Sequence, residues 1–178
     1  MHMGIEIRTA VPEDATAVCA VLRRSITECC ADDHQNCPAI LASWLGNKTP
    51  ETVATWFATP TNHTLVAVID GDVVGVALLT QAGKVSLCYV LPEVMHRGAG
   101  KLLLAGLEQQ ARAWGISVIK LKSTVSAHDF FARNGYINGG KEMSCFGIES
   151  DFFWKNLNEP VTDASLDARK RFCGCTGQ

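Results

Sequence analysis

The sequence lacks the long apolar runs, basic clusters and leader segments that mark several large classes of protein. None of its apolar stretches approaches the roughly 20 residues needed to cross a bilayer. The first residues carry neither the basic region nor the apolar core of a secretory signal, so we expect a cytoplasmic protein without a membrane partner. Lys and Arg form no run interleaved with aromatic residues, which argues against a nucleic-acid partner.

Cysteine, in contrast, is abundant, with eight residues, but its positions do not predict a disulfide framework. Cys19 falls on the apolar side of an expected helix, and Cys88 and Cys145 fall in expected strands. A free cysteine in such places behaves as a small apolar side chain. We therefore expect the cysteines to be reduced, in keeping with a cytoplasmic protein.

The composition predicts one globular domain. The 178 residues are 47% apolar and carry a net charge of −2, which is enough apolar material for a substantial core. We expect the domain to span 1–157 and a polar tail at 158–178 to form a peripheral helix or to be partly disordered. Strand and helix periodicities alternate and predict an α/β fold. Strands are expected at 4–9, 65–69, 73–79, 85–91, 116–121 and, once or twice, within 136–149.

The most informative local feature is a basic, glycine-containing turn that follows an apolar stretch and opens a long amphipathic helix. Gly98 and Gly100 let an oxygen-rich ligand approach the main chain, and Arg97 and Lys101 add positive charge. Main-chain N–H groups and the helix dipole favour an anion at such a place. The turn is neither G-x-x-x-x-G-K-[ST] nor G-x-G-x-x-G. It suits a pyrophosphate, although an ordinary strand–turn–helix with glycines for tight packing would look similar.

Residues 92–107 resemble the acyl-CoA-binding motif of the GNAT N-acetyltransferases. That motif reads Q/R-x-x-G-x-G/A and continues into the helix as Leu-Leu-x-x-Leu-Glu. Met95 stands where the family usually has Gln or Arg. The positions in register are Gly98, Gly100, Leu103, Leu104, Leu107 and Glu108.

A second segment, 121–136, resembles the later motif of the same family, a strand followed by N/S/T-x-x-A-x-x-F-Y on a helix and then G-F/Y. Ser126 and Asp129 predict a capping box for this helix, and Gly135 suits its C′ position. Phe131 stands where many members place a Tyr that protonates the leaving sulfur. The positions in register are Thr124, Ala127, Phe130, Gly135 and Tyr136.

The resemblance implies a GNAT fold, with a central mixed, mostly antiparallel sheet of six to seven strands flanked by about four helices. It also implies an enzyme that moves an acetyl group from acetyl-CoA to a primary amine of a small molecule or protein. Dimers are common in the family, so the resemblance admits a homodimer. In the family a strand N–H stabilises the oxyanion, which corresponds to Val90 here. The cofactor-binding residues implied are Tyr89, Val90, Leu91, Met95, His96, Arg97, Gly98, Ala99, Gly100, Lys101, Thr124, Asp129 and Phe130.

The catalytic base is sought in the polar loop expected at 31–38, because the resemblance places this loop beside the acceptor. Asp33 could bind a cationic amine, and His34 could bind or deprotonate it, since imidazole ordinarily titrates near neutral pH. A solvated loop with capping residues is the alternative interpretation. His128 lies closer to the second motif and is expected to face solvent.

Two further interpretations remain open. Met95, Phe131 and the absence of an evident base favour a non-catalytic acyl-CoA-binding module. A zinc-dependent interaction protein is the weaker interpretation, because its candidate ligands contain no C-x₂-C pair and no matching second knuckle, so no metal is expected. Those candidates are Cys29, Cys30, His34 and Cys37, with Cys173 and Cys175 if the tail folds back.

Overall fold

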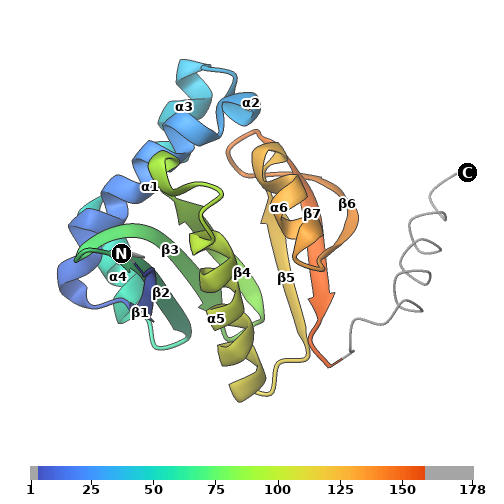
Figure 1. Cartoon of the computed structure of the whole chain (residues 1–178). Helices are drawn as coiled ribbons and strands as arrows, with labels where there is room; N and C mark the ends of the chain where they lie inside the picture. The colour runs from blue at the N-terminus through green and yellow to red at the C-terminus, as the bar shows by residue number, and fades with distance from the viewer. Residues whose placement is uncertain (1–3, 159–178) are drawn as a thin grey trace, which may run out of the picture.

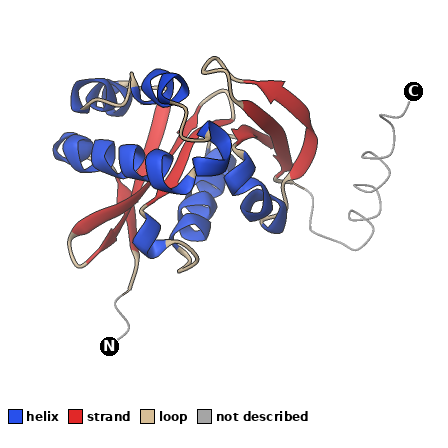
Figure 2. Cartoon of the chain, turned by 90° about the horizontal axis from the view of Figure 1, so that it is seen from above, coloured by secondary structure: helices blue, strands red, loops and turns tan. Residues whose placement is uncertain are grey.

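The computed structural model describes residues 4–158, which form one seven-stranded mixed sheet with helices on both faces (Figures 1 and 2). The strand order is β1-β2-β3-β4-β5-β7-β6. Every neighbouring pair is antiparallel except β4 and β5, which are parallel. The strands are β1 (Glu6–Thr9), β2 (Asn62–Ile69), β3 (Asp72–Thr80), β4 (Lys84–Val90), β5 (Val118–Ser123), β6 (Ile137–Met143) and β7 (Glu149–Asn156). The expected mixed, mostly antiparallel sheet is confirmed.

Helices connect the strands and cover the sheet. They are α1 (Ala15–Cys29), α2 (Ala31–His34), α3 (Pro38–Leu45), α4 (Pro50–Ala58), α5 (Ala99–Ala113) and α6 (His128–Arg133). Three 3₁₀ turns precede α1, α5 and α6, namely η1 (Pro12–Asp14), η2 (Pro92–Val94) and η3 (Val125–Ala127). No helix within residues 4–158 is both long enough and apolar enough to span a bilayer.

Two apolar layers hold the helices to the sheet. On one face, α5 and α6 pack on residues such as Leu121 and Phe153 through Leu103, Leu104 and Phe131. On the other face, α1 packs on β3 and β4, and α4 packs beside α1 on β2. Because helices cover both faces of β3, the central residues of this strand are nearly all apolar and buried, rather than alternately apolar and polar.

The parallel pair β4–β5 separates soon after it begins. The two strands are in register only at Lys84 with Lys120 and at Val85 with Leu121. Beyond these positions β4 continues against β3, and β5 continues against β7. The sheet therefore splits into two halves that diverge toward the loop preceding α5, as Figure 1 shows between β4 and β5.

Several local expectations need correction. The capping box of Ser126 and Asp129 does not form, because the Thr124 hydroxyl caps η3 by accepting the Ala127 N–H at 3.2 Å. Cys145 lies exposed in the turn between β6 and β7 rather than in a strand. Part of the loop expected at 31–38 is the short helix α2.

Gly135 agrees with the expectation, because it follows α6 with a φ of +86°, as its predicted C′ position requires. The predicted tail lies, apart from Asn158, outside the described residues.

Candidate functional site

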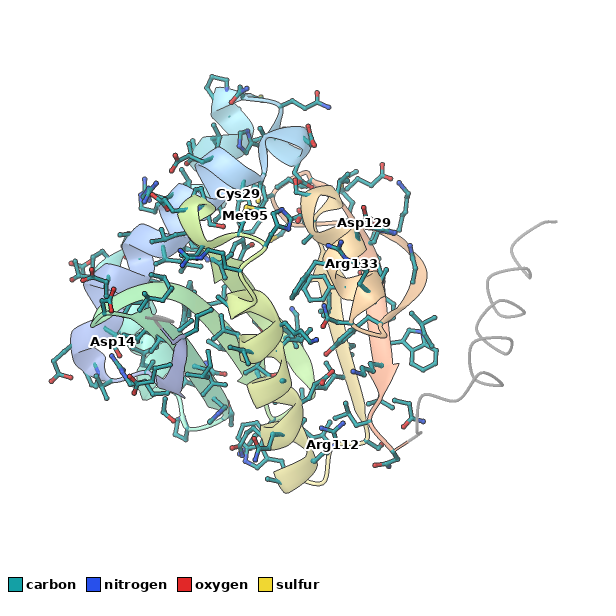
Figure 3. The ribbon with its side chains drawn as sticks, in the orientation of Figure 1. Asp14, Cys29, Met95, Arg112, Asp129 and Arg133 are labelled. Carbon is teal, nitrogen blue, oxygen red and sulfur yellow. The ribbon has the colours of Figure 1, made fainter. Side chains whose placement is uncertain are left out.

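A groove of about 770 Å³ lies where β4 and β5 separate. One wall consists of β4, the loop after it and the first turn of α5, and the opposite wall of β5, η3 and α6. The C-terminal end of α1 adds Ser25, Cys29 and Cys30. Figure 3 shows Cys29 near Met95 on one side of the gap, and Asp129 on the other. The groove is large enough for a drug-sized ligand.

The loop that opens α5 is built as an anion-binding site. His96 and Gly98 have φ values of +62° and +94°, so the chain turns sharply before the helix. Within residues 4–158, the N–H groups of Gly98, Ala99, Gly100 and Lys101 donate to no other main-chain group. The first N–H groups of a helix lack intrahelical acceptors, and they carry the positive end of the dipole of the 15-residue α5.

The two glycines of this loop serve different purposes. At Gly98 a Cβ would meet nothing within 4 Å, so the requirement there is the left-handed backbone. At Gly100 a Cβ would lie 3.2 Å from Cζ of Phe130, so the glycine lets α6 approach the start of α5. The open space is therefore at Gly98, where a phosphate-bearing group can lie close to the main chain.

The free edge of β4 offers further donors. Leu91 donates its N–H to the Val74 carbonyl at 2.8 Å, which fixes the alternation of the antiparallel β3–β4 ladder. By that alternation the N–H groups of Cys88 and Val90 point away from β3 and toward the gap. Because β5 has already diverged, this part of β4 can form strand-like hydrogen bonds with an extended ligand. Burial raises the pKa of the Cys88 thiol to about 12, which keeps it neutral.

Most of the predicted cofactor-binding residues line the groove, and three do not. Leu91 turns its N–H to β3, Ala99 is buried beneath the loop, and Arg97 is exposed outside the lining. The residues that the structure brings together along the groove are Tyr89, Val90, Met95, His96, Gly98, Gly100, Lys101, Thr124, Asp129 and Phe130.

The two side chains predicted to be catalytic, His34 and Asp33, lie outside the lining, whereas the predicted main-chain donor Val90 lies in it. His34 is fully buried, and its Nε2 lies 3.1 Å from the Ile26 carbonyl oxygen and 3.2 Å from that of Thr27. Its Nδ1 accepts the Asn36 N–H at 2.9 Å. Both ring nitrogens are thus used by the main chain, and the His34 ring is not directed at the groove, contrary to the sequence-based expectation.

Asp33 joins α2 to η3, which belongs to one wall of the groove, instead of pointing into the groove. Its carboxylate accepts the Val125 N–H at 2.6 Å and both the N–H and the hydroxyl of Ser126. His128 turns away as well, with its Nδ1 2.7 Å from Asp151, on the side of α6 that faces β7.

Sequence reasoning missed several residues of the lining, among them three at the C-terminal end of α1. Ser25 and Cys29 lie four residues apart, and Cys30 follows the helix, so all three face the groove at its α1 end. Burial raises the pKa of the Cys30 thiol to about 12, and burial also raises that of Cys29. The sequence suggested Cys29 and Cys30 only as candidate zinc ligands.

The zinc interpretation gains no support from this region. In the described part of the chain, no group of three or more His, Cys, Asp or Glu side chains is arranged to hold a metal ion. His34, one of its candidate ligands, uses both ring nitrogens in hydrogen bonds. Cys173 and Cys175 lie outside the described residues.

Comparison with known proteins identifies relatives of the whole described fold. The model of an acetyltransferase (GNAT) domain matches residues 32–150. A crystallised GCN5-related N-acetyltransferase of Rhodopseudomonas palustris is 25% identical, with a TM-score of 0.77 over 88% of this chain and 98% of the other. PaiA N-acetyltransferase of Thermoplasma acidophilum, crystallised with coenzyme A, is 22% identical, with a TM-score of 0.72 over 86% and 99%. YncA of Salmonella typhimurium, crystallised with acetyl-CoA, is 19% identical, with a TM-score of 0.68 over 89% and 97%. No curated protein matches the sequence.

Proposed function

Because this chain belongs to the GNAT acetyltransferase family, we propose that it transfers an acetyl group from acetyl-CoA to a primary amine of a small molecule or protein. The amine attacks directly while both substrates are bound. The observation that carries the proposal is the set of main-chain N–H groups at the start of α5, placed beside the unpaired edge of β4. Solved relatives that hold coenzyme A or acetyl-CoA support the same cofactor.

In this proposal each part of the groove holds a different part of acetyl-CoA. The N–H groups of Gly98, Gly100 and Lys101 donate to the pyrophosphate, which the helix dipole and the Lys101 side chain also favour. The edge of β4 binds the extended pantetheine through main-chain hydrogen bonds. Phe130, which packs against Gly100, forms the apolar floor beneath it.

Once acetyl-CoA is bound, the transfer step requires few further groups from the protein. The amine nitrogen forms a bond to the thioester carbon, and the N–H of Val90 donates to the oxyanion that develops there. The thioester bond then breaks and the sulfur leaves with the electron pair. Because neither Asp33 nor His34 lines the groove, we assign the ammonium proton to solvent rather than to either side chain.

Phe131 lines the groove where many relatives carry the Tyr that protonates the sulfur. A phenyl ring cannot donate a proton. An ordinary thiol, with a pKa near 8.5, leaves adequately as a thiolate, so the reaction does not require the donor.

A non-catalytic acyl-CoA-binding module is the second candidate. It is favoured by Phe131 together with the positions of Asp33 and His34, which leave the groove without either of the side chains predicted to bind or deprotonate the amine. Such a module would bind acetyl-CoA as tightly as an enzyme but would release no CoA in the presence of amines.

The test is acetyl-CoA binding by calorimetry, followed by CoA release from a panel of primary amines. We expect binding, and a gain of about 2.7 kcal/mol in the free energy of unfolding at 100 times the Kd. Amine-dependent CoA release supports the transferase, whereas binding without release supports the module. Absence of acetyl-CoA binding would overturn both.

A further inference from the structure

The segment between α1 and α3, residues 30–37, forms a stiff arm beside the groove. Its hydrogen bonds are local and dense: Gln35 donates to the Ala31 carbonyl at 2.7 Å, and Cys37 to that of His34 at 2.9 Å. Gln35 and Asn36 both adopt positive φ values, +50° and +54°, which residues other than glycine seldom do in succession. This turn brings the chain back from α2 to the start of α3.

His34 fixes this arm to the end of α1. The last carbonyl groups of a helix have no intrahelical partner, and Ile26 and Thr27 lie in the last turn of α1. Since Nδ1 accepts from Asn36, the ring proton lies on Nε2, which donates to those two carbonyls. The ring also packs edge-on against Trp44 of α3, with 6.5 Å between centroids. His34 thus holds α2 in one orientation.

In this orientation of α2, Asp33 contacts η3, which belongs to the wall formed by β5, η3 and α6. The carboxylate accepts two main-chain N–H groups and one hydroxyl from Val125 and Ser126, which are more than ninety residues away in the sequence. We call this contact the Asp33 latch. Ser126 and Cys29 both line the groove, so the latch lies beside the α1 end of the groove (Figure 1, between α2 and α6).

We propose that the Asp33 latch closes the α1 end of the groove and restricts the acceptor to small, unhindered amines. The inference rests on the proposed function, because the α1 end is where an acceptor meets the free edge of β4. A groove of about 770 Å³ that also holds the acyl end of acetyl-CoA leaves room for a small molecule. The lysine side chain of a folded protein would need the latch to open. Asp33 is therefore a positioning residue that determines acceptor size.

The first test measures access to the groove without any cofactor. Cys29 is labelled in parallel with iodoacetamide and with a maleimide carrying a long polyethylene glycol chain, and labelling at Cys29 is quantified by peptide mass. The thiolate fraction affects both reagents, so their rate ratio reports access. We expect Asp33→Ala to raise the ratio of bulky to small labelling about fivefold. Ser126→Ala keeps α2 intact and should raise the ratio less, because two N–H donors remain.

Asp32→Ala is the matched control, since Asp32 is exposed on the same short helix. Its labelling ratio should equal that of the wild type. An unchanged ratio in both Asp33→Ala and Ser126→Ala would overturn the latch. An equal rise with both reagents would also overturn it, because it would mean that residues 30–37 had unfolded rather than opened.

The second test measures acceptor size by kinetics. With acetyl-CoA, kcat/KM is compared for glycinamide and for a lysine-containing decapeptide. Asp33→Ala should shift the preference toward the peptide about fivefold while leaving acetyl-CoA affinity within twofold. An unchanged preference would overturn the role in specificity. If the wild type does not bind acetyl-CoA, the proposed function fails, and the labelling ratio still decides the latch separately.

Discussion

The β4–α5 wall and the α1–α2 side of the groove are built from different kinds of group. The β4–α5 wall presents main-chain N–H groups, directed by Gly98, by the start of α5 and by the alternation of β4. The α1–α2 side is held by side chains, with His34 fixing α2 and Asp33 reaching across to η3. Figure 3 shows the two sides meeting near Cys29 and Met95.

This difference determines which residues of the groove tolerate substitution and which do not. A donor supplied by the main chain survives a change of side chain, provided that the backbone keeps its path. Exposed side chains on the loop, such as Met95 and His96, can therefore vary with little effect on the shape of the site. A contact made by one side chain is lost with that side chain, so the α1–α2 side depends on His34 and Asp33 individually.

The largest effect should come from changing the path of the loop backbone. Gly98→Val places a β-branched residue at a φ of +94°, which should redirect several N–H groups and weaken acetyl-CoA binding about 100-fold. The matched control is Gly115→Val, since Gly115 has a φ of +75° and equally open space around its Cβ, at the far end of α5. Calorimetry and thermal melting of both variants check the result.

Both glycine variants should lose similar stability, because both strain the backbone by about 1–3 kcal/mol. Only Gly98→Val should lose acetyl-CoA affinity. Affinity at the wild-type level in this variant would remove the loop from the binding site.

A smaller effect, on stability rather than on binding, is expected on the α1–α2 side. His34→Ala removes hydrogen bonds to buried carbonyls and leaves a cavity beside Trp44, which should lower the free energy of unfolding by about 3 kcal/mol. Chemical denaturation measures this loss, with His96→Ala as a control on an exposed loop histidine. A collapse of turnover with unchanged stability would instead assign His34 to the chemistry.

The features that could be predicted from the sequence are those that depend on short segments of the chain. The glycine turn, the amphipathic α5 and the strand periodicities each depend on residues within about fifteen positions of one another. The C′ position of Gly135 follows from the same local rules, and the structure has this residue at positive φ. Main-chain recognition could therefore be anticipated before any tertiary contact was known.

The roles of Asp33, His34 and Ser126 could not be predicted in this way. Thr124 and Ser126 both offer a hydroxyl near the start of the same helix, and local rules favoured Ser126, which is not the cap. The choice depends on Asp33, which engages the Ser126 hydroxyl and leaves the cap to Thr124. His34 was polar in a polar segment, and only the position of the α1 carbonyls shows why it is buried.

The smallest expected effect is a change in acetyl-CoA affinity caused by a side chain on the β4–α5 wall. Met95 is 38% exposed, lines the groove and occupies the position that is Gln or Arg in the GNAT motif that residues 92–107 resemble. Met95→Gln should add one hydrogen bond to the cofactor and strengthen acetyl-CoA binding about threefold, because a net hydrogen bond contributes about 0.5–1.5 kcal/mol. Met143→Gln, at an exposed position of β6, should leave affinity unchanged. A 100-fold gain in affinity for Met95→Gln would contradict the view that the main chain supplies most of the binding free energy. A modest gain would mean that the side chain only adjusts a site that the backbone has already formed.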